Sequence, residues 1–178
     1  RAYREPASQF PRTRLDAEAV RDNALSIAGL LRHRIGGKPV PVSDGNPVPD
    51  TRSIYLRHQR GEPYATFTTF DAPDRFACTA KRPRSNTPLQ ALALLNDPCF
   101  TAAARALSER VMKELPGAST KDRVTRMFRL CLSRAPKPDE LAELTGLHDQ
   151  KPTRGDEAGA CLAVANVLLN LHETITKE

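Results

Sequence analysis

The stretch Arg84-Ser-Asn-Thr-Pro-Leu-Gln-Ala-Leu-Ala-Leu-Leu-Asn-Asp-Pro98 contains two helix starts in tandem. Thr87, Pro88 and Gln90 stand in the order of a capping box with proline at the first helical position. A short apolar run follows, and Asp97-Pro98 then begins a second helix by the same device. The stretch therefore predicts two consecutive helices, with Thr87 as the cap of the first.

A basic run lies directly before this helix start. Free N–H groups at a helix N-terminus, next to arginines, bind anions such as sulfate, phosphate or carboxylate. We therefore predict an anion-binding site at Arg82, Arg84, Asn86 and Thr87. In the alternative, structural interpretation, Arg84 and Asn86 tie the loop to a buried acid or to carbonyl groups. We expect Arg84 to face Asp71, the acidic residue of the preceding loop.

Apolar residues recur at helical spacing over most of the remaining chain. The pattern predicts helices over 15–35, from Pro98 to about Leu115, from Ser119, over 139–148 and over 156–174. The last of these is apolar on most sides from Cys161 to Leu171, as is typical of a central helix in a bundle. In the helix that begins at Ser119, we expect Arg123 to face water.

The fold class that follows is mainly α: a compact bundle of five or six helices with a small β-hairpin or extended patch near residues 52–70. Ser53–Arg57 alternates apolar and polar residues, and Ala65–Phe70 is rich in β-forming residues. Residues 66–70 are equally compatible with a short helical turn. We expect one globular domain, in which residues 1–51 hold an arm, the first helix and a Pro/Gly-rich loop, and 52–178 hold the hairpin and the bundle.

The charge is uneven along the chain. Residues 1–86 carry 15 Lys and Arg against 9 Asp and Glu, whereas residues 87–178 carry 12 of each. The excess of 15 − 9 = 6 positive charges favours an acidic polymer or a small anion as a partner of the first half, although a solubilising surface has the same composition. With only 9 aromatic residues and no recognition motif, nucleic acid is not an expected partner.

Motifs for the commonest chemistries are missing from the sequence. The four cysteines form no CxxC or CxxCH pattern, so neither a zinc ribbon nor a c-type haem attachment is predicted. The histidines have no metal-ligand spacing, and no apolar run is long enough to span a membrane. We expect no cofactor and no metal in this chain.

Two carboxylates are the only catalytic candidates. Asp71 and Asp74 flank Ala72-Pro73. A pair of carboxylates provides the acid and base of glycoside hydrolysis when suitably placed. Asp-x-Pro is also a common turn and cap arrangement, so both interpretations stay open.

Three motifs together resemble a known family. Thr68-Thr-Phe-Asp-Ala-Pro73, Cys78-Thr79 and the stretch 84–98 are similar to the C-terminal domain (domain of unknown function 1553) of planctomycete-type cytochrome c domain-containing proteins. Residues 14–22, Gly36-Gly37 and the closing segment 165–173 resemble the same domain. The resemblance implies an exported protein, periplasmic or at the cell surface, of which this chain is the C-terminal part, with haem c in a separate N-terminal part.

Two functions are compatible with these observations. The first is a non-catalytic accessory or interaction domain of an exported multidomain protein, whose partners are the other domains of the same protein. The alternative is a part of an enzyme that acts on carbohydrate or another anionic substrate, coupled to electron transfer through the haem domain.

Overall fold

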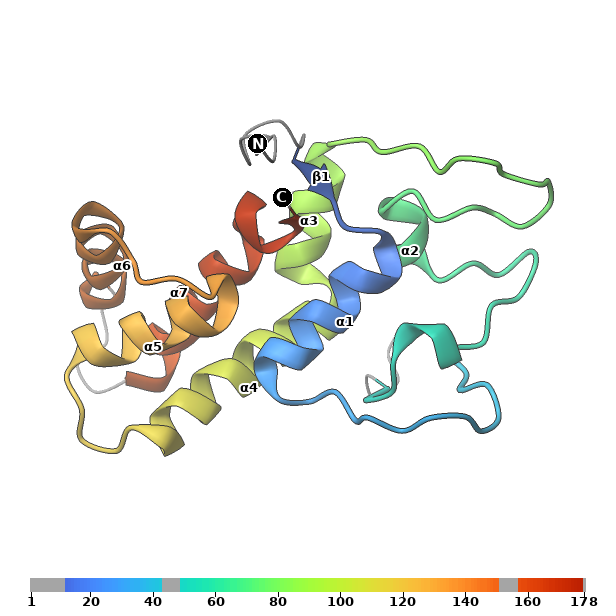
Figure 1. Cartoon of the computed structure of the whole chain (residues 1–178). Coiled ribbons are helices and arrows are strands. Elements are labelled where there is room, and N and C mark those ends of the chain that lie inside the picture. Colours follow the sequence, from blue (N-terminus) through green and yellow to red (C-terminus); the bar gives the residue numbers. More distant parts are fainter. Residues whose placement is uncertain (1–11, 43–48, 151–156, 178) are drawn as a thin grey trace, which may run out of the picture.

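The computed structural model describes residues 12–42, 49–150 and 157–177. Within these ranges the chain is mainly helical, with a small antiparallel sheet, as the sequence predicts (Figure 1). The helices are α1 (Ala17–Ala28), α2 (Ala65–Thr69), α3 (Pro88–Asn96), α4 (Pro98–Glu114), α5 (Thr120–Leu132), α6 (Pro138–Asp149) and α7 (Glu157–Asn170). Two 3-10 turns, η2 (Ser53–Tyr55) and η3 (His172–Thr174), and two short strands, β1 (Thr13–Arg14) and β2 (Thr176–Lys177), complete the described elements.

The core lies where α4 meets α7 and α1. α4 packs against α7 and against α1, and α5 and α6 add to the α7 end of the molecule (Figure 1). The fully buried residues on α4 and α7 are small or aliphatic at the contact. They include Ala103, Ala104, Leu107, Val111, Val164, Ala165 and Leu168. The central position predicted for the last helix is confirmed, and α4 shares it because alanines let both neighbours approach closely.

The tandem helix start forms as predicted. Thr87 has an extended backbone (φ −119°, ψ 150°) and holds the cap position before α3, and its N–H donates to the side-chain oxygen of Gln90 at 3.5 Å. The Gln90 N–H donates to the Thr87 carbonyl at 3.1 Å, and the Thr87 side chain makes no capping hydrogen bond of its own. Asp97 begins α4 by accepting a 2.7 Å hydrogen bond from the Cys99 N–H. Asp97 is the one residue between α3 and α4: it ends the first helix and caps the second, so its extended backbone (φ −63°, ψ 135°) sets the turn between them.

The sheet joins the two ends of the described chain instead of forming a hairpin near residue 60. Thr13 pairs with Lys177, and Arg14 pairs with Thr176. Within 52–70 the chain forms η2, α2 and isolated bridges, one of which joins Val40 to Leu56. The helical alternative for 66–70 is therefore confirmed. The strand predicted at Ser53–Arg57 is wrong.

Buried Arg21 of α1 ties down the chain at residues 49–53. The side chain of Arg21 is fully buried. It donates to the carbonyl oxygens of Pro49 and Thr51 and to the Ser53 hydroxyl. A buried guanidinium needs several acceptors, and these three groups supply them.

Two predicted helix ends and one predicted orientation are wrong. The first helix ends at Ala28 instead of Ile35, because Gly29 takes a left-handed conformation (φ 77°). The last helix ends at Asn170 and continues as η3. Arg123 is buried: it donates to the Leu115 carbonyl at 3.2 Å and pairs with Glu157. The turns expected at 44–46 and 151–155, and most of the arm before residue 12, lie outside the described residues.

Gly29 gives a direct test of the helix end. We expect Gly29→Ala to lower the free energy of unfolding by about 1 kcal/mol, because a left-handed backbone strains any residue with a Cβ atom. Gly146 lies inside α6, and a Cβ atom added there would meet no other atom within 4 Å. Gly146→Ala is therefore the matched control and is expected to be neutral or stabilising. Urea unfolding of both variants measures the difference, and equal effects would contradict the assignment of Gly29 as the C-terminal cap.

Candidate functional site

The polar residues of the two central motifs contact one another. Asp71, within the first motif, accepts hydrogen bonds from the Ser85 N–H at 2.8 Å and from the Ser85 hydroxyl at 2.8 and 2.9 Å. Gln90 donates to the Ser85 hydroxyl at 3.1 Å and to the Thr69 carbonyl at 3.0 Å. These contacts close the loop from residue 71 to residue 85 at its base.

Arg14 completes this arrangement from the N-terminal strand. Its guanidinium lies 2.6 Å from an Asp71 carboxylate oxygen, donates to the carbonyls of Phe70 and Ser85, and lies 5.6 Å from the centre of the Phe70 ring. We call Arg14, Asp71, Ser85 and Gln90 the motif clamp. It fixes β1, the end of α2 and the start of α3 to one another.

Electrostatics keep the clamp charged at neutral pH. Burial raises the pKa of Asp71, but hydrogen bonds from the Ser85 N–H and the Arg14 guanidinium outweigh this effect and hold the pKa below its ordinary value. Asp71 also has a left-handed backbone (φ 62°), which Asp tolerates better than most residues. The carboxylate is therefore ionised, and its oxygens are occupied by donors within the fold.

The four predicted anion-site residues do not converge on one point. The Arg82 guanidinium forms a two-pronged pair with Glu18 of α1, at 2.6 and 3.1 Å. Arg84 and Asn86 are exposed and have no hydrogen bond or ion pair with any residue that the structure describes, and Thr87 begins α3. The counter-ion of Asp71 is Arg14, so the expected pairing with Arg84 is wrong. The anion site itself stays a prediction.

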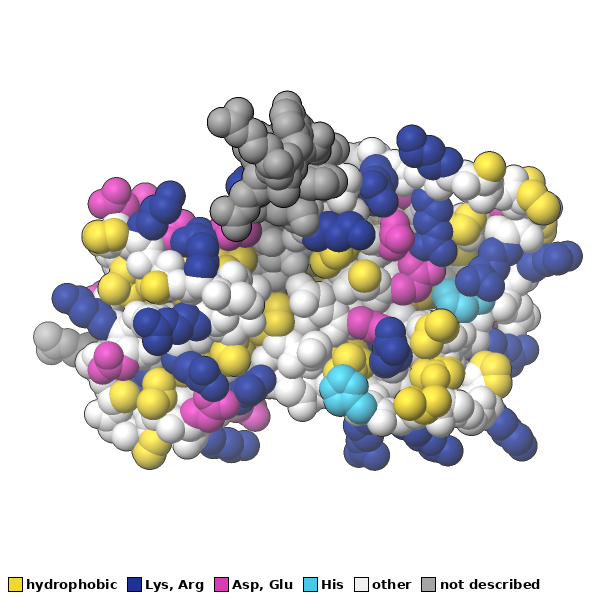
Figure 2. Space-filling view, in the orientation of Figure 1, with side chains coloured by type: hydrophobic (Ala, Val, Ile, Leu, Met, Phe, Trp, Pro, Cys, Tyr) yellow, Lys and Arg dark blue, Asp and Glu magenta, His cyan; other side chains and the backbone are white. Residues whose placement is uncertain are grey.

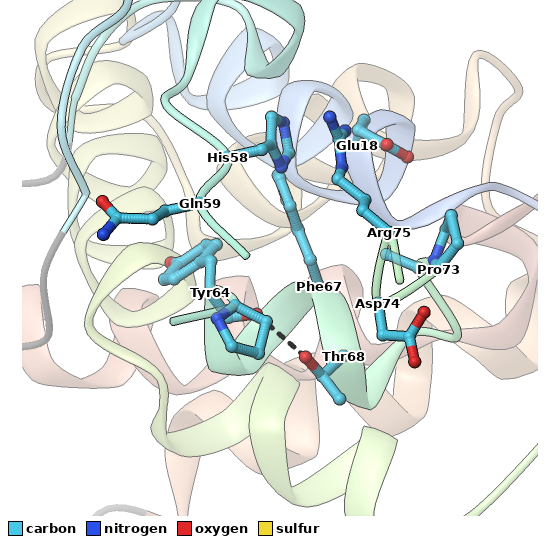
Figure 3. Close-up of a pocket in the computed structure, with 11 residues that line it drawn as sticks. Glu18, His58, Gln59, Tyr64, Phe67, Thr68, Pro73, Asp74 and Arg75 are labelled. Carbon is cyan, nitrogen blue, oxygen red and sulfur yellow. Dashed lines mark hydrogen bonds between the residues drawn. The ribbon is translucent and has the colours of Figure 1, made fainter. Parts of the chain in front are cut away.

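A pocket lies beside the clamp, between α1, α2 and the loop 72–75. It is lined by Glu18, His58, Gln59, Pro63, Tyr64, Phe67, Thr68, Ala72, Pro73, Asp74 and Arg75. Figure 3 shows His58, Glu18 and Arg75 on one side of it, and Tyr64 and Thr68 on the other. The enclosed space of about 20 Å³ admits about one water molecule.

A wider depression adjoins this pocket and shares three of its residues. Its lining consists of Asp16, Glu18, Ala19, Asp22, Arg52, Ile54, His58, Arg75 and Arg82, and it encloses about 600 Å³. Asp74 lines the first pocket, is exposed, and accepts a hydrogen bond from the Phe76 N–H at 3.1 Å. A catalytic role for Asp71 and Asp74 stays a prediction.

His58, Glu18 and Arg75 are the side chains that line both hollows. The His58 ring stacks on Phe67, with the ring centres 5.5 Å apart. Burial lowers the pKa of His58, the nearby Arg75 guanidinium lowers it further, and Glu18 only partly offsets both. The imidazole is therefore neutral at pH 7, when it both donates and accepts a hydrogen bond.

Sequence reasoning missed Arg14, Glu18, His58 and Arg75. Arg14 and Glu18 lie more than fifty residues before their partners, and His58 and Arg75 have no motif around them. The signals in the sequence were the excess of basic residues before position 87 and the family resemblance of residues 14–22, which contain Arg14 and Glu18. No group of three or more His, Cys, Asp or Glu side chains in the described part of the chain is arranged to hold a metal ion. No described helix is long and apolar enough to cross a membrane.

The fold and the clamp define a small helical domain closed by a polar cluster between two sequence motifs. The chain belongs to the PSD1 family, proteins of unknown function (DUF1553), whose model matches residues 3–148. No curated protein and no solved structure matches the chain. The family match ends before α7, although α7 packs on α4 in the same core.

Proposed function

We propose that this chain is a non-catalytic accessory or interaction domain of an exported multidomain protein, where it docks another domain of the same protein. The observation that carries the proposal is an uncharged helix face turned to solvent. On α3, Leu89, Leu92 and Leu95 are 60%, 54% and 45% exposed. We call these three residues the α3 leucine face.

The face is unusual because α3 contains no charged residue at all. The opposite side of the helix, with Gln90 and Leu94, is already buried in the domain. Solvent-facing helix surfaces normally carry charges, and a contiguous apolar patch on a helix marks an interaction surface.

A permanent neighbour fits this face better than a transient partner. Interfaces that never dissociate are more apolar than transient ones and resemble a divided core. The similarity to proteins with further N-terminal domains supplies such a neighbour in the same chain. In this proposal the protein works outside the cytoplasm, in the periplasm or at the cell surface, and any haem c belongs to the N-terminal part.

The clamp supports a non-catalytic role for the motifs. An acid–base pair needs carboxyl groups that are open to a substrate. The oxygens of Asp71 accept from Ser85 and Arg14, and the fork of Arg82 is filled by Glu18. These polar groups of the motifs hold the domain together, and the α3 leucine face lies outside their hydrogen-bond network.

Amide hydrogen exchange tests the docking. In the full-length protein we expect the α3 amides to exchange at least about tenfold more slowly than in this chain alone, because docking suppresses local opening. Leu92→Asp in the full-length protein should remove that protection. Ile35→Asp is the control, since Ile35 is 93% exposed and lies outside α3. Equal protection of α3 with and without the N-terminal part would contradict the proposal.

A further inference from the structure

The arginine at the boundary of the two hollows forms no hydrogen bond or ion pair within the described residues. Arg75 is exposed, has a left-handed backbone (φ 66°), and lines both the pocket and the wider depression. The other two arginines of the depression face acids: Arg82 pairs with Glu18, and Arg52 lies 3.8 Å from Asp22. Arg75 is thus the cation of this lining whose guanidinium is available for a ligand.

We propose that the depression binds the carboxylate of an acidic sugar, with Arg75 as its anchoring cation. The planar guanidinium fork matches a carboxylate with two parallel hydrogen bonds. The space of about 600 Å³ falls within the range of about 300–1,000 Å³ that is typical of ligand sites.

The rest of the lining is suited to hydroxyl groups. Asp16 begins α1 without using its side chain as a cap, so its carboxylate can accept hydrogen bonds from a ligand. His58 is neutral and held by its stacking on Phe67. Exposed Ile54 supplies an apolar wall beside them. A sugar acid combines one carboxylate, several hydroxyls and an apolar ring face, and so satisfies all of these groups.

The surface around the depression is compatible with an acidic ligand. Figure 2 shows Lys and Arg side chains around the rim of the molecule on the right, the side formed in Figure 1 by α2 and the long loops, with fewer Asp and Glu side chains among them. Such a field raises the local concentration of anions and speeds their arrival. Within the depression the three arginines are matched by Asp16, Glu18 and Asp22, so the preference for an acidic sugar over a neutral one comes from the basic rim and from Arg75, which has no acidic partner among the described residues.

Binding of glucuronate, followed by amide chemical shifts in this chain, tests the proposal. We expect shifts near Glu18, His58 and Arg75, and at least about tenfold weaker binding by Arg75→Gln, which corresponds to about 1.4 kcal/mol. Arg84→Gln is the matched control: it removes an equal charge from an exposed arginine of the same loop, and its affinity should stay within about twofold of the parent. Arg75→Lys should bind with intermediate affinity, because it keeps the charge without the fork.

Glucose and inorganic sulfate separate the contributions of hydroxyls and charge. Weak binding of both, relative to glucuronate, is the expected result. If glucose bound as tightly as glucuronate, the role of Arg75 would be overturned. If sulfate bound as tightly as glucuronate, the hydroxyl groups would contribute nothing and the depression would be a simple anion site. Loss of binding in Arg84→Gln instead would favour the site expected from the sequence, and no shifts with glucuronate would refute the proposal. The α3 leucine face is untouched by these variants, so this test and the docking test can fail separately.

Discussion

Leu168→Asp is expected to unfold the domain. Leu168 is fully buried on α7, the helix that packs on α4 at the centre of the core. An unpaired carboxylate in such a place costs several kcal/mol, in addition to the lost burial of the leucine. Because a domain of this size is stable by only about 5–15 kcal/mol, a cost of this size populates the unfolded state.

Val167→Asp is the matched control for this experiment. Val167 is the preceding residue of the same helix, but it is 37% exposed. The new carboxylate stays hydrated there, so we expect the free energy of unfolding to change by only about 0.5 kcal/mol. Thermal unfolding followed by circular dichroism compares the two variants. If Leu168→Asp melts at the temperature of Val167→Asp, the central position of α7 is wrong.

Asp71→Asn is expected to lower the free energy of unfolding by about 2–3 kcal/mol, because charge-assisted hydrogen bonds in a mostly buried place are worth about this much. Asparagine keeps the shape of the side chain and tolerates the left-handed backbone, so the loss reports on the charge. The partners that lose a carboxylate are the Arg14 guanidinium and the Ser85 N–H.

Asp74→Asn is the matched control in the same loop. Asp74 is exposed and accepts only from the Phe76 N–H among the described contacts, so we expect a change within about 0.5 kcal/mol. A double-mutant cycle with Arg14→Gln then isolates the ion pair. Additive effects of Asp71→Asn and Arg14→Gln would show that the two side chains do not interact.

The same pair predicts how stability depends on pH. The folded pKa of Asp71 lies below its ordinary value of 3.8. A lowered pKa adds stability above the unfolded pKa, and this contribution disappears as the pH falls through the folded pKa. We therefore expect the free energies of unfolding of the parent and of Asp71→Asn to show their full difference near pH 7. The two values should converge as the pH falls through the folded pKa of Asp71. A difference that persists below the folded pKa would point to a loss of packing instead of charge.

The local helix signals could be read from the sequence with accuracy because their causes are local. The cap before α3 uses Thr87 and Gln90, which are three positions apart. The cap of α4 joins Asp97 to the Cys99 N–H, two positions apart. The same holds for Ser119, whose hydroxyl oxygen accepts from the Asp122 N–H at 3.2 Å. The apolar periodicity placed α4 and α5 and the body of α7 correctly, although α7 ends earlier than predicted, since one face of each had to be buried.

The orientation of the arginines could not be read in the same way. Arg21 and Arg123 are buried and the side chain of Arg14 is nearly so, although arginine is usually solvated. Each one is buried because carbonyl or carboxylate groups from a distant segment surround it, and those segments become neighbours only when α1, α4 and α7 pack. For the same reason the sequence pointed to Arg84 as the partner of Asp71, whereas β1 brings Arg14 there.

The sequence by itself determined the helical class, the tandem caps at Thr87 and Asp97, and the burial of the last helix, because these depend on backbone groups and apolar spacing within a few residues. The tertiary structure alone decided that Asp71 is closed off by Arg14 and Ser85, that Arg75 and His58 line one hollow, and that the α3 leucines remain outside. These outcomes depend on which distant surfaces meet, and charge and hydrogen-bond partners are chosen only after the helices have packed.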